Sequence, residues 1–261
     1  MSVARADKMR LYCFPYAGGS ATAIYTKWRR HLPTWLELHP VEFPGRGRRI
    51  NEDLLRDMPT LAGTLANELS SELHPSHIFF GHSLGALVAF EVAKALVARG
   101  KPAPAMLLVS GADAPTVRDD QRYSNLRSDA EVLTHLRELN GTPPEVLENQ
   151  DLLALMLPII KADFEICGNY RYASGRLLEC PVHAFGGRLD TTTPESLAAW
   201  SEECTGRFSL DLLEGDHFFI NSELDRLLSL IVGLAQGLGH GAWQASAGSA
   251  LRTTEGEFTA A

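Results

Sequence analysis

The sequence predicts an α/β fold in which a mostly parallel central sheet is flanked by helices. Two observations predict it: short, apolar, β-rich runs alternate with amphipathic runs of helix length, and most of the short runs end at Gly, Pro or a small residue. The expected strands are Leu11–Phe14, Leu36–Phe43, His77–Phe80, Ala105–Ser110, Val182–Phe185 and Ser209–Leu213. The expected helices are Thr22–His31, Thr60–Leu73, Leu84–Arg99, Pro194–Cys204 and Glu223–Ala235.

The composition is that of an ordinary globular protein. The chain has 261 residues, enough for one large α/β domain with an inserted subdomain, and 45% of them are hydrophobic against 21% charged. A formal net charge of −8 argues against a broad phosphate-binding surface, so no nucleic-acid partner is expected. No apolar run reaches the roughly 18 residues of a membrane span, and the first ten residues lack the apolar core of a secretory signal. We therefore expect a cytoplasmic protein without membrane contact, and a monomer.

The sequence has four widely spaced cysteines and no C-x-x-C pair: Cys13, Cys167, Cys180 and Cys204. His183 lies three residues after Cys180, but nothing else completes a set of four metal ligands. We expect reduced and mostly buried thiols, with no metal site and no cofactor.

One segment breaks the alternation of strands and helices. Residues 114–179 contain no convincing strand and show only helical periodicity. Ser128 begins a capping-box pattern with Glu131, and Asp151–Tyr170 carries apolar residues all round, with Pro158 expected to kink or break that helix. An all-helical insertion between two strands of a parallel sheet indicates a lid over the carboxyl edge of the sheet, where ligands bind in open α/β sheets. A structural embellishment without a gating role is the alternative.

These patterns divide the chain into three parts. Residues 1–113 and 180–236 make up the expected α/β core, and residues 114–179 the helical lid insertion. Residues 237–261 are rich in Gly, Ala, Ser and Thr and lack periodicity, so we expect a disordered tail there.

A candidate nucleophile lies where an expected strand meets an expected helix. Residues 81–85, GHSLG, match the pattern G-x-S-x-G at the junction of the strand His77–Phe80 and the helix Leu84–Arg99. In that setting the pattern predicts the nucleophile elbow of the α/β-hydrolase fold, because the tight turn strains the serine and the glycines let the helix pass close to the strand. The helix N-terminus also favours developing negative charge. Ser83 is therefore the expected nucleophile, with a structural glycine turn as the alternative.

A serine hydroxyl needs a base, and nine histidines compete for that role. His217 follows the last expected strand in a loop, and the order serine, acid, histidine of this fold favours a late histidine. His82 is next to the serine and is expected to point elsewhere, His183 lies inside a strand, and His240 falls in the expected tail. The remaining histidines fall outside any such constellation: His31, His39, His74, His77 and His135. We expect His217 to be the base.

Two aspartates compete to hold the imidazole in its productive tautomer. Asp190 follows the strand Val182–Phe185 and precedes the helix that begins at Pro194. A carboxylate at that place would also stabilise the imidazolium. Asp113 follows the preceding strand and is the rival acid, whereas Asp216 is badly placed to reach the far nitrogen of its neighbour. We favour Asp190.

The oxyanion hole needs two backbone donors. Leu84, directly after the serine, is expected to supply one. The other should come from the loop after the first strand, where Gly18 and Gly19 permit the backbone to turn its amides toward the site. Ala17 is the expected donor, with Tyr16 as the alternative.

Taken together, these residues resemble the type II thioesterases, the stand-alone editing hydrolases of nonribosomal peptide and polyketide synthases. The resemblance runs from about Leu11 to Ala235. It rests on several motifs in order: FPYAGG at 14–19, PGRGR at 44–48, GHSLGA at 81–86, SG at 110–111 with AP at 114–115, ADF at 162–164, GG-x-x-D at 186–190 and GDHF at 215–218. It implies that Ser83, Asp190 and His217 are the triad, with Ala17 and Leu84 as the oxyanion donors.

The resemblance also implies the reaction and the partners. The expected activity is hydrolysis of acyl or aminoacyl thioesters from the phosphopantetheine arm of carrier domains, through an acyl-enzyme, which clears blocked carriers. A general carboxylesterase or lipase-like hydrolase of small esters is the alternative, since one fold hosts many chemistries. The sequence departs from the resemblance at Asp113, where relatives often carry a basic residue, and at Leu189 and Thr193, where an acidic residue and a valine are more common.

Two further groups of residues have a functional and a structural interpretation. Arg46, Arg48 and Arg49 form a basic cluster that either contacts an acidic carrier protein or its phosphate, or forms internal salt bridges in a turn. Six apolar or aromatic residues of the insertion either line an acyl tunnel or form the core of the lid: Met156, Leu157, Ile160, Phe164, Tyr170 and Tyr172.

Overall fold

The central sheet of the computed structural model has six strands, and every pairing between them is parallel. The structure describes residues 8–119, 123, 128–139, 147–175 and 177–239. In chain order the strands are β1 (Met9–Phe14), β2 (Leu36–Pro40), β3 (His77–His82), β4 (Met106–Ser110), β5 (Val182–Gly187) and β6 (Phe208–Leu213). They lie side by side in the order β2-β1-β3-β4-β5-β6. All six expected strands and the predicted parallel sheet are thus confirmed.

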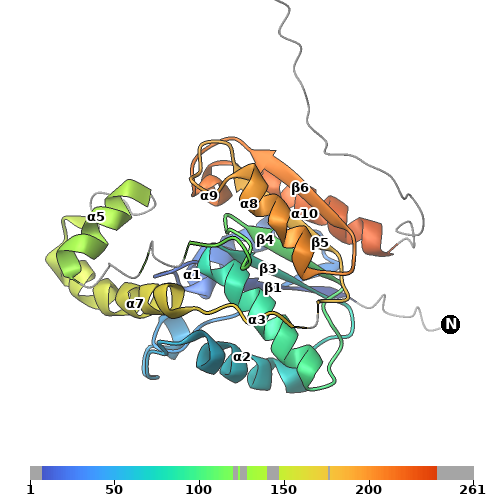
Figure 1. The fold of residues 1–261 in the computed structure, drawn as a ribbon, viewed down its shortest axis with the longest axis horizontal. Helices are drawn as coiled ribbons and strands as arrows, with labels where there is room; N and C mark the ends of the chain where they lie inside the picture. Colours follow the sequence, from blue (N-terminus) through green and yellow to red (C-terminus); the bar gives the residue numbers. More distant parts are fainter. Residues whose placement is uncertain (1–7, 120–122, 124–127, 140–146, 176, 240–261) are drawn as a thin grey trace, which may run out of the picture.

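Both faces of the sheet are buried, as the apolar strands predict. Side chains along β1 alternate between the two faces: Tyr12 and Phe14 point to one core cluster, and Leu11 and Cys13 to the other. The first cluster is covered by α2 (Met58–Glu72) and α3 (Leu84–Ala98), and the second by α1 (Ala21–Tyr25) and α10 (Leu224–Gly239). Figure 1 shows these layers around the sheet.

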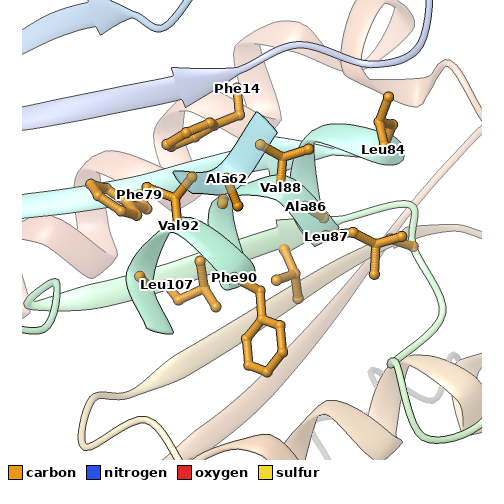
Figure 2. Close-up of a cluster of buried hydrophobic side chains, with 14 of the residues drawn as sticks. Phe14, Ala62, Phe79, Leu84, Ala86, Leu87, Val88, Phe90, Val92 and Leu107 are labelled. Atoms are coloured by element: carbon orange, nitrogen blue, oxygen red, sulfur yellow. The ribbon is translucent and has the colours of Figure 1, made fainter. Parts of the chain in front are cut away.

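Helix α3 lies at the centre of the first cluster. Figure 2 shows its side chains, among them Ala86 and Val88, in one cluster with the sheet residues Phe14 and Phe79 and the α2 residue Ala62. Ten of its fifteen residues are buried, so it packs on the sheet and on α2 at once. A helix with that much buried surface is held firmly, and its N-terminus with it.

The strand order reverses between β1 and β3. The chain leaves β1 toward α1 on one face and leaves β3 toward α3 on the other. The loops after these two strands therefore diverge at the carboxyl edge and leave a crevice, the place where open α/β sheets bind ligands. These are the two loops in which the sequence places the oxyanion donors and the nucleophile.

Several expected boundaries shift. Strand β2 ends at Pro40, before Phe43, and the carboxylate of Glu42 beyond it accepts hydrogen bonds from Ala21 N (2.8 Å) and Thr22 N (3.2 Å) at the start of α1. Helices α1 and α8 (Pro194–Ala198) each continue as a 3₁₀ helix, η1 (Thr26–Arg30) and η3 (Ala199–Glu203). Over one turn, repeats of 3.0 and 3.6 residues give the same apolar spacing, so the sequence pattern does not separate them.

The end of the core also differs from the expectation. A four-residue helix, α9 (Phe219–Ser222), precedes α10, and α10 continues to Gly239. The helix expected to end at Ala235 therefore extends further, and Leu238 packs against the core. The rest of the expected tail, residues 240–261, lies outside the described residues.

The insertion between β4 and β5 contributes two long helices, α5 (Asp129–Leu139) and α7 (Gln150–Asn169), which Figure 1 shows to one side of the sheet. The predicted capping box forms at α5, where Ser128 N donates to Glu131 Oε2 (2.8 Å) and Glu131 N donates to Ser128 Oγ (3.3 Å). Pro158 does not break α7, since it sits on an exposed face where water can satisfy the released carbonyl. In the described part of the chain, no helix is long and apolar enough to cross a membrane.

Candidate active site

Ser83 occupies a strained turn between β3 and α3. Its backbone φ of 55° and ψ of −121° make it the one non-glycine residue with positive φ among those that the structure describes. Such a conformation costs on the order of 1–3 kcal/mol and persists only where the surroundings impose it. The surroundings do so through a hydrogen bond from Ser83 N to Ser110 O (2.7 Å) and through the packing of α3.

The two glycines of the elbow are required by close backbone contacts. A Cβ atom added at Gly81 would lie 2.1 Å from Gly85 O, and one added at Gly85 would lie 2.2 Å from Phe14 O. Real Cβ atoms do not approach backbone oxygen that closely, and neither backbone segment is free to move. The sequence pattern thus reflects a physical requirement: the helix start, the strand end and the loop after β1 touch through backbone atoms.

The loops after β5 and β6 bring Asp190 and His217 together. His217 Nδ1 lies 2.9 Å from Asp190 Oδ2, and the two side chains are 12% and 1% exposed. Burial by itself raises the pKa of Asp190, but the hydrogen bond and charge of His217 outweigh it, so the pKa of this carboxyl is lowered from its ordinary value. An ionised carboxylate only accepts hydrogen bonds, so Nδ1 carries the proton and Nε2 is left to accept one.

Asp113 has a different partner. Its Oδ1 accepts a hydrogen bond from Ser196 Oγ, on α8. Ser83, His217 and Asp113 all line one polar cavity, yet it is Asp190 that touches the imidazole. Of the two aspartates weighed from the sequence, the structure brings Asp190 to His217.

His82 is a neighbour of the site that the sequence reasoning set aside. It is fully buried, its Nδ1 lies 2.9 Å from Ser110 Oγ, and its ring centroid lies 5.0 Å from that of His217. Burial, and then the charge of His217, lower the pKa of His82 to about 3. The alternation along β3 was the available signal, because Phe80 and His82 share a strand face, toward α9.

The expected oxyanion donors lie in the two loops of the crevice. Among hydrogen bonds between described residues, none uses the N–H of Ala17, Tyr16 or Leu84. Gly19 N donates back to Tyr16 O (3.0 Å), which closes the turn. Ala17 and Tyr16 line a cavity together with Ser83, so both positions weighed from the sequence border the site.

Two cavities meet at Ser83 and His217. The first, of about 260 Å³, is mostly apolar and reaches between the loop after β1 and the inserted helices. The second, of about 190 Å³, is polar and runs toward Asp113 and Thr192. A larger cavity of about 760 Å³ lies between α2, α3 and the segment after α7; Tyr170 lines it, but none of the expected catalytic residues or oxyanion donors does.

The residues expected to line an acyl tunnel divide between cavity and core. Met156, Ile160 and Phe164 line the apolar cavity beside Ser83. Tyr170 and Tyr172 instead donate hydrogen bonds to Glu91 and Glu203, each at 2.6 Å, and Leu157 lines a separate surface cavity.

The basic cluster is largely structural. Arg46 is 3% exposed and forms a bidentate ion pair with Asp163. Arg49 pairs with Glu52 and Glu68, while Arg48 is exposed. Internal salt bridging is therefore confirmed for two of the three arginines, and a carrier contact through them is not supported.

The four cysteines and His183 are buried within the fold. All four cysteines are free and buried, as expected. His183 lies within β5, with Nδ1 2.6 Å from Ser209 Oγ. No group of three or more potential metal ligands occurs within the described ranges.

The fold and this site define the class: the chain is an α/β hydrolase, with a serine at the elbow after one strand and a histidine–carboxylate pair after later strands. A family model described as "Thioesterase domain" matches residues 9–233, and the chain therefore belongs to the thioesterase family. The resemblance drawn from the motifs is confirmed.

Individual relatives agree with this assignment. The gramicidin S biosynthesis protein GrsT of Aneurinibacillus migulanus is 38% identical over 84% of this chain and 86% of its own. The thioesterase RedJ from the prodiginine pathway of Streptomyces coelicolor superposes with a TM-score of 0.80, at 36% identity over 87% of this chain and 86% of that one. BorB, the type II thioesterase of the borrelidin cluster, has a TM-score of 0.80 at 36% identity, over 89% and 94%. The chain is thus a thioesterase of the type II group.

Proposed function

We propose that this thioesterase removes acyl or aminoacyl groups from the phosphopantetheine arm of carrier domains in a natural-product synthase, and so frees blocked carriers. The observation that carries the proposal is the strained Ser83 beside a hydrogen-bonded His217–Asp190 pair, at the junction of two cavities. The named roles of the relatives support the substrate class, since GrsT belongs to gramicidin S biosynthesis and RedJ to the prodiginine pathway.

Acylation begins with proton transfer. His217 Nε2 takes the proton of Ser83 Oγ as the oxygen attacks the thioester carbonyl carbon, and the carbonyl becomes an oxyanion. The N–H groups of Ala17 and Leu84 donate to that oxyanion, and the α3 N-terminus adds its positive dipole end. Asp190 stabilises the imidazolium. When the carbon–sulfur bond breaks, His217 returns the proton to the leaving thiolate, so the free phosphopantetheine thiol departs.

Deacylation repeats the sequence with water. His217 Nε2 takes a proton from a water molecule whose oxygen attacks the acyl-serine carbonyl. Collapse of the second oxyanion breaks the bond to Ser83 Oγ, and His217 returns the proton to that oxygen. The acid is released and the free serine is restored, without any cofactor.

The cavities suggest how a substrate lies. The apolar cavity suits the acyl group, because most of its wall is aliphatic or aromatic. The inserted helices that form its outer wall act as a lid over the site. Carrier domains are the protein partners in this proposal, and the enzyme works as a monomer in the cytoplasm, without nucleic acid or membrane.

The test compares two leaving groups on the same acyl chain. We expect acyl-phosphopantetheinyl carrier to be hydrolysed with a higher kcat/KM than the matched oxygen ester. Ser83→Ala is the control variant and should abolish both reactions, as well as labelling by a fluorophosphonate. Faster turnover of the oxygen ester, with no gain from the carrier, would contradict the proposal and favour a general carboxylesterase.

A further inference from the structure

A buried ion pair joins the inserted helix α7 to the core beside the active site. Arg46 Nη1 lies 2.5 Å from Asp163 Oδ2, and Arg46 Nη2 lies 2.7 Å from Asp163 Oδ1. The Asp163 side chain has no exposed surface, and that of Arg46 is 3% exposed. Removing two charges from water is costly, and further hydrogen bonds to the buried charges offset that cost.

Asp163 makes a third hydrogen bond, to the loop that carries the expected oxyanion donor. Gly18 N donates to Asp163 Oδ2 at 2.7 Å. Gly18 directly follows Ala17, so this bond holds the peptide group between the two residues and with it the backbone torsion of Ala17. An amide that donates to a carboxylate makes a short, strong, charge-assisted bond.

A packing contact reinforces the same link. Gly18 has a φ of +76°, and a Cβ atom there would lie 2.6 Å from Ile160 Cγ1. Ile160 precedes Asp163 by three residues, so it lies on the same side of α7. Helix α7 thus meets the loop through one apolar side chain and one carboxylate.

The ends of the loop are held from the core instead. Tyr25 Oη donates to Phe14 O at 2.7 Å, where the loop leaves β1. At the other end, Glu42 accepts hydrogen bonds from Ser20 Oγ and Ala21 N, both at 2.8 Å. Among the described residues, the polar contact between the middle of the loop and another element is the one with Asp163.

We infer that Asp163 is a positioning residue for the oxyanion hole and that Arg46 holds its carboxylate aimed at Gly18. Asp163 does not touch the reacting atoms. It sets the direction of the loop backbone and couples the inserted helix to the catalytic centre, so that displacement of α7 also disturbs the Ala17 donor. The inference rests on the proposed function, because it takes Ala17 as an oxyanion donor.

The first variant is Asp163→Asn. An asparagine has one acceptor oxygen, so it cannot satisfy both Gly18 and the two Arg46 donors. Loss of one oxyanion donor costs about 10²–10³-fold in kcat, and a displaced donor costs less. We expect kcat to fall by about 10- to 100-fold while KM stays within about twofold, since the walls of the apolar cavity remain.

The matched control is Glu165→Gln, two residues further along α7. Glu165 forms an exposed ion pair with Arg56, at 2.9 Å, and so also links α7 to the core. It is the same acid-to-amide change on the same helix, but it does not touch the loop. Both kinetic constants of this variant should stay within about twofold of the parent values.

A pair of inhibitors separates positioning from simple loss of structure. An alkyl trifluoromethyl ketone binds as an adduct of Ser83 whose oxyanion needs the hole, whereas the matched methyl ketone binds chiefly through its alkyl chain. For Asp163→Asn, affinity for the trifluoromethyl ketone should fall by the same factor as kcat, with affinity for the methyl ketone unchanged. Active enzyme is counted from the end point of fluorophosphonate labelling.

A second variant guards against misfolding of the first. Replacing the Gly18 amide by an ester in the full chain removes only the N–H donor and leaves the ion pair intact. It should reproduce the fall in kcat and in trifluoromethyl ketone affinity. Unchanged kinetics in this ester variant, or equal losses for both ketones in Asp163→Asn, would overturn the inference. Thioesterase activity that persists in the Ser83→Ala variant would instead overturn the proposed mechanism.

Discussion

The imidazole of His82 lies against that of His217, with ring centroids 5.0 Å apart and planes inclined by 43°. Two histidines this close cannot both be charged without strong repulsion, and the pKa of His82, lowered to about 3, keeps its ring neutral at neutral pH. Ser110 holds that ring through its hydroxyl and holds the nucleophile through its carbonyl. His82 is thus a neutral side chain that packs against His217. Ser110, at the end of β4, holds both the His82 ring and the backbone of Ser83.

The neutrality of His82 predicts how stability depends on pH. In the unfolded chain a histidine has a pKa of about 6.5, so below that pH the unfolded state binds a proton that the folded state refuses. Stability from this residue is therefore complete above pH 6.5 and falls as the pH drops toward 3, by up to about 1.4 kcal/mol per pH unit. Urea denaturation of the parent and of His82→Gln measures the difference.

The variant should be less stable than the parent at pH 8, because it loses the packing against His217 and the bond to Ser110. That difference should shrink as the pH falls from 6.5 to 5. A difference that stays constant over this range would mean that His82 titrates normally in the folded protein.

Replacing each candidate acid tests the choice of carboxylate. Asp190→Asn should lower kcat by about 10⁴-fold, because an amide that donates to Nδ1 would impose the wrong tautomer on His217. Asp113→Asn removes only the charge near Ser196 and should leave kcat within about threefold. Steady-state kinetics on a thioester substrate measure both variants. A larger loss of kcat in Asp113→Asn than in Asp190→Asn would identify Asp113, after β4, as the acid.

The elbow and the candidate triad could be predicted from the sequence, whereas the ion pair that holds the loop after β1 could not. Short, mostly apolar strands and a G-x-S-x-G run at a strand–helix junction are local patterns that can be recognised in the order of residues. Asp190 follows from the same logic, since it lies in the loop after β5, and β5 pairs with β6, the strand before His217. The pairing of Arg46 with Asp163 could not be read, because 117 residues separate them and only the packing of α7 brings them together.

Solvent exposure explains two differences between the expected and the observed helices. The sequence predicts that Pro158 kinks or breaks its helix, but α7 continues through it, because water can satisfy the carbonyl that loses its hydrogen bond on this exposed face. Gly237 looks like a stop signal, yet the neighbouring Leu238 packs on the core and α10 continues to Gly239. Both outcomes depend on solvent exposure, which the order of residues alone does not specify.

Gly85 should be irreplaceable for a steric reason. An alanine there would place its Cβ 2.2 Å from Phe14 O and 2.7 Å from Pro15 O, so the helix start or the loop after β1 must move. We expect Gly85→Ala to destabilise the fold by about 1–3 kcal/mol, as overpacking does, and to lower kcat through the displaced loop.

Gly63 provides the matched control. It lies in the middle of α2, and a Cβ atom there meets nothing within 4 Å. Gly63→Ala should stabilise the protein by about 0.5–1 kcal/mol through helix propensity alone, with kcat unchanged. Urea denaturation measures both variants, and equal stability changes in the two would refute the steric account of the elbow.

The size of the apolar cavity should set the preferred acyl length. Met156 lines it from α7, and a tryptophan at this position would fill part of its volume of about 260 Å³. Each methylene that no longer fits forfeits about 0.8 kcal/mol, or roughly fourfold in kcat/KM. Met156→Trp should therefore leave kcat/KM for acetyl thioesters within twofold of the parent value, while lowering kcat/KM for decanoyl thioesters by at least about tenfold.

Leu155→Trp is the control. Leu155 is the adjacent residue of α7 but is 69% exposed, so this variant should leave the ratio of decanoyl to acetyl turnover unchanged. A ratio that moves equally in both variants would place the acyl chain outside this cavity.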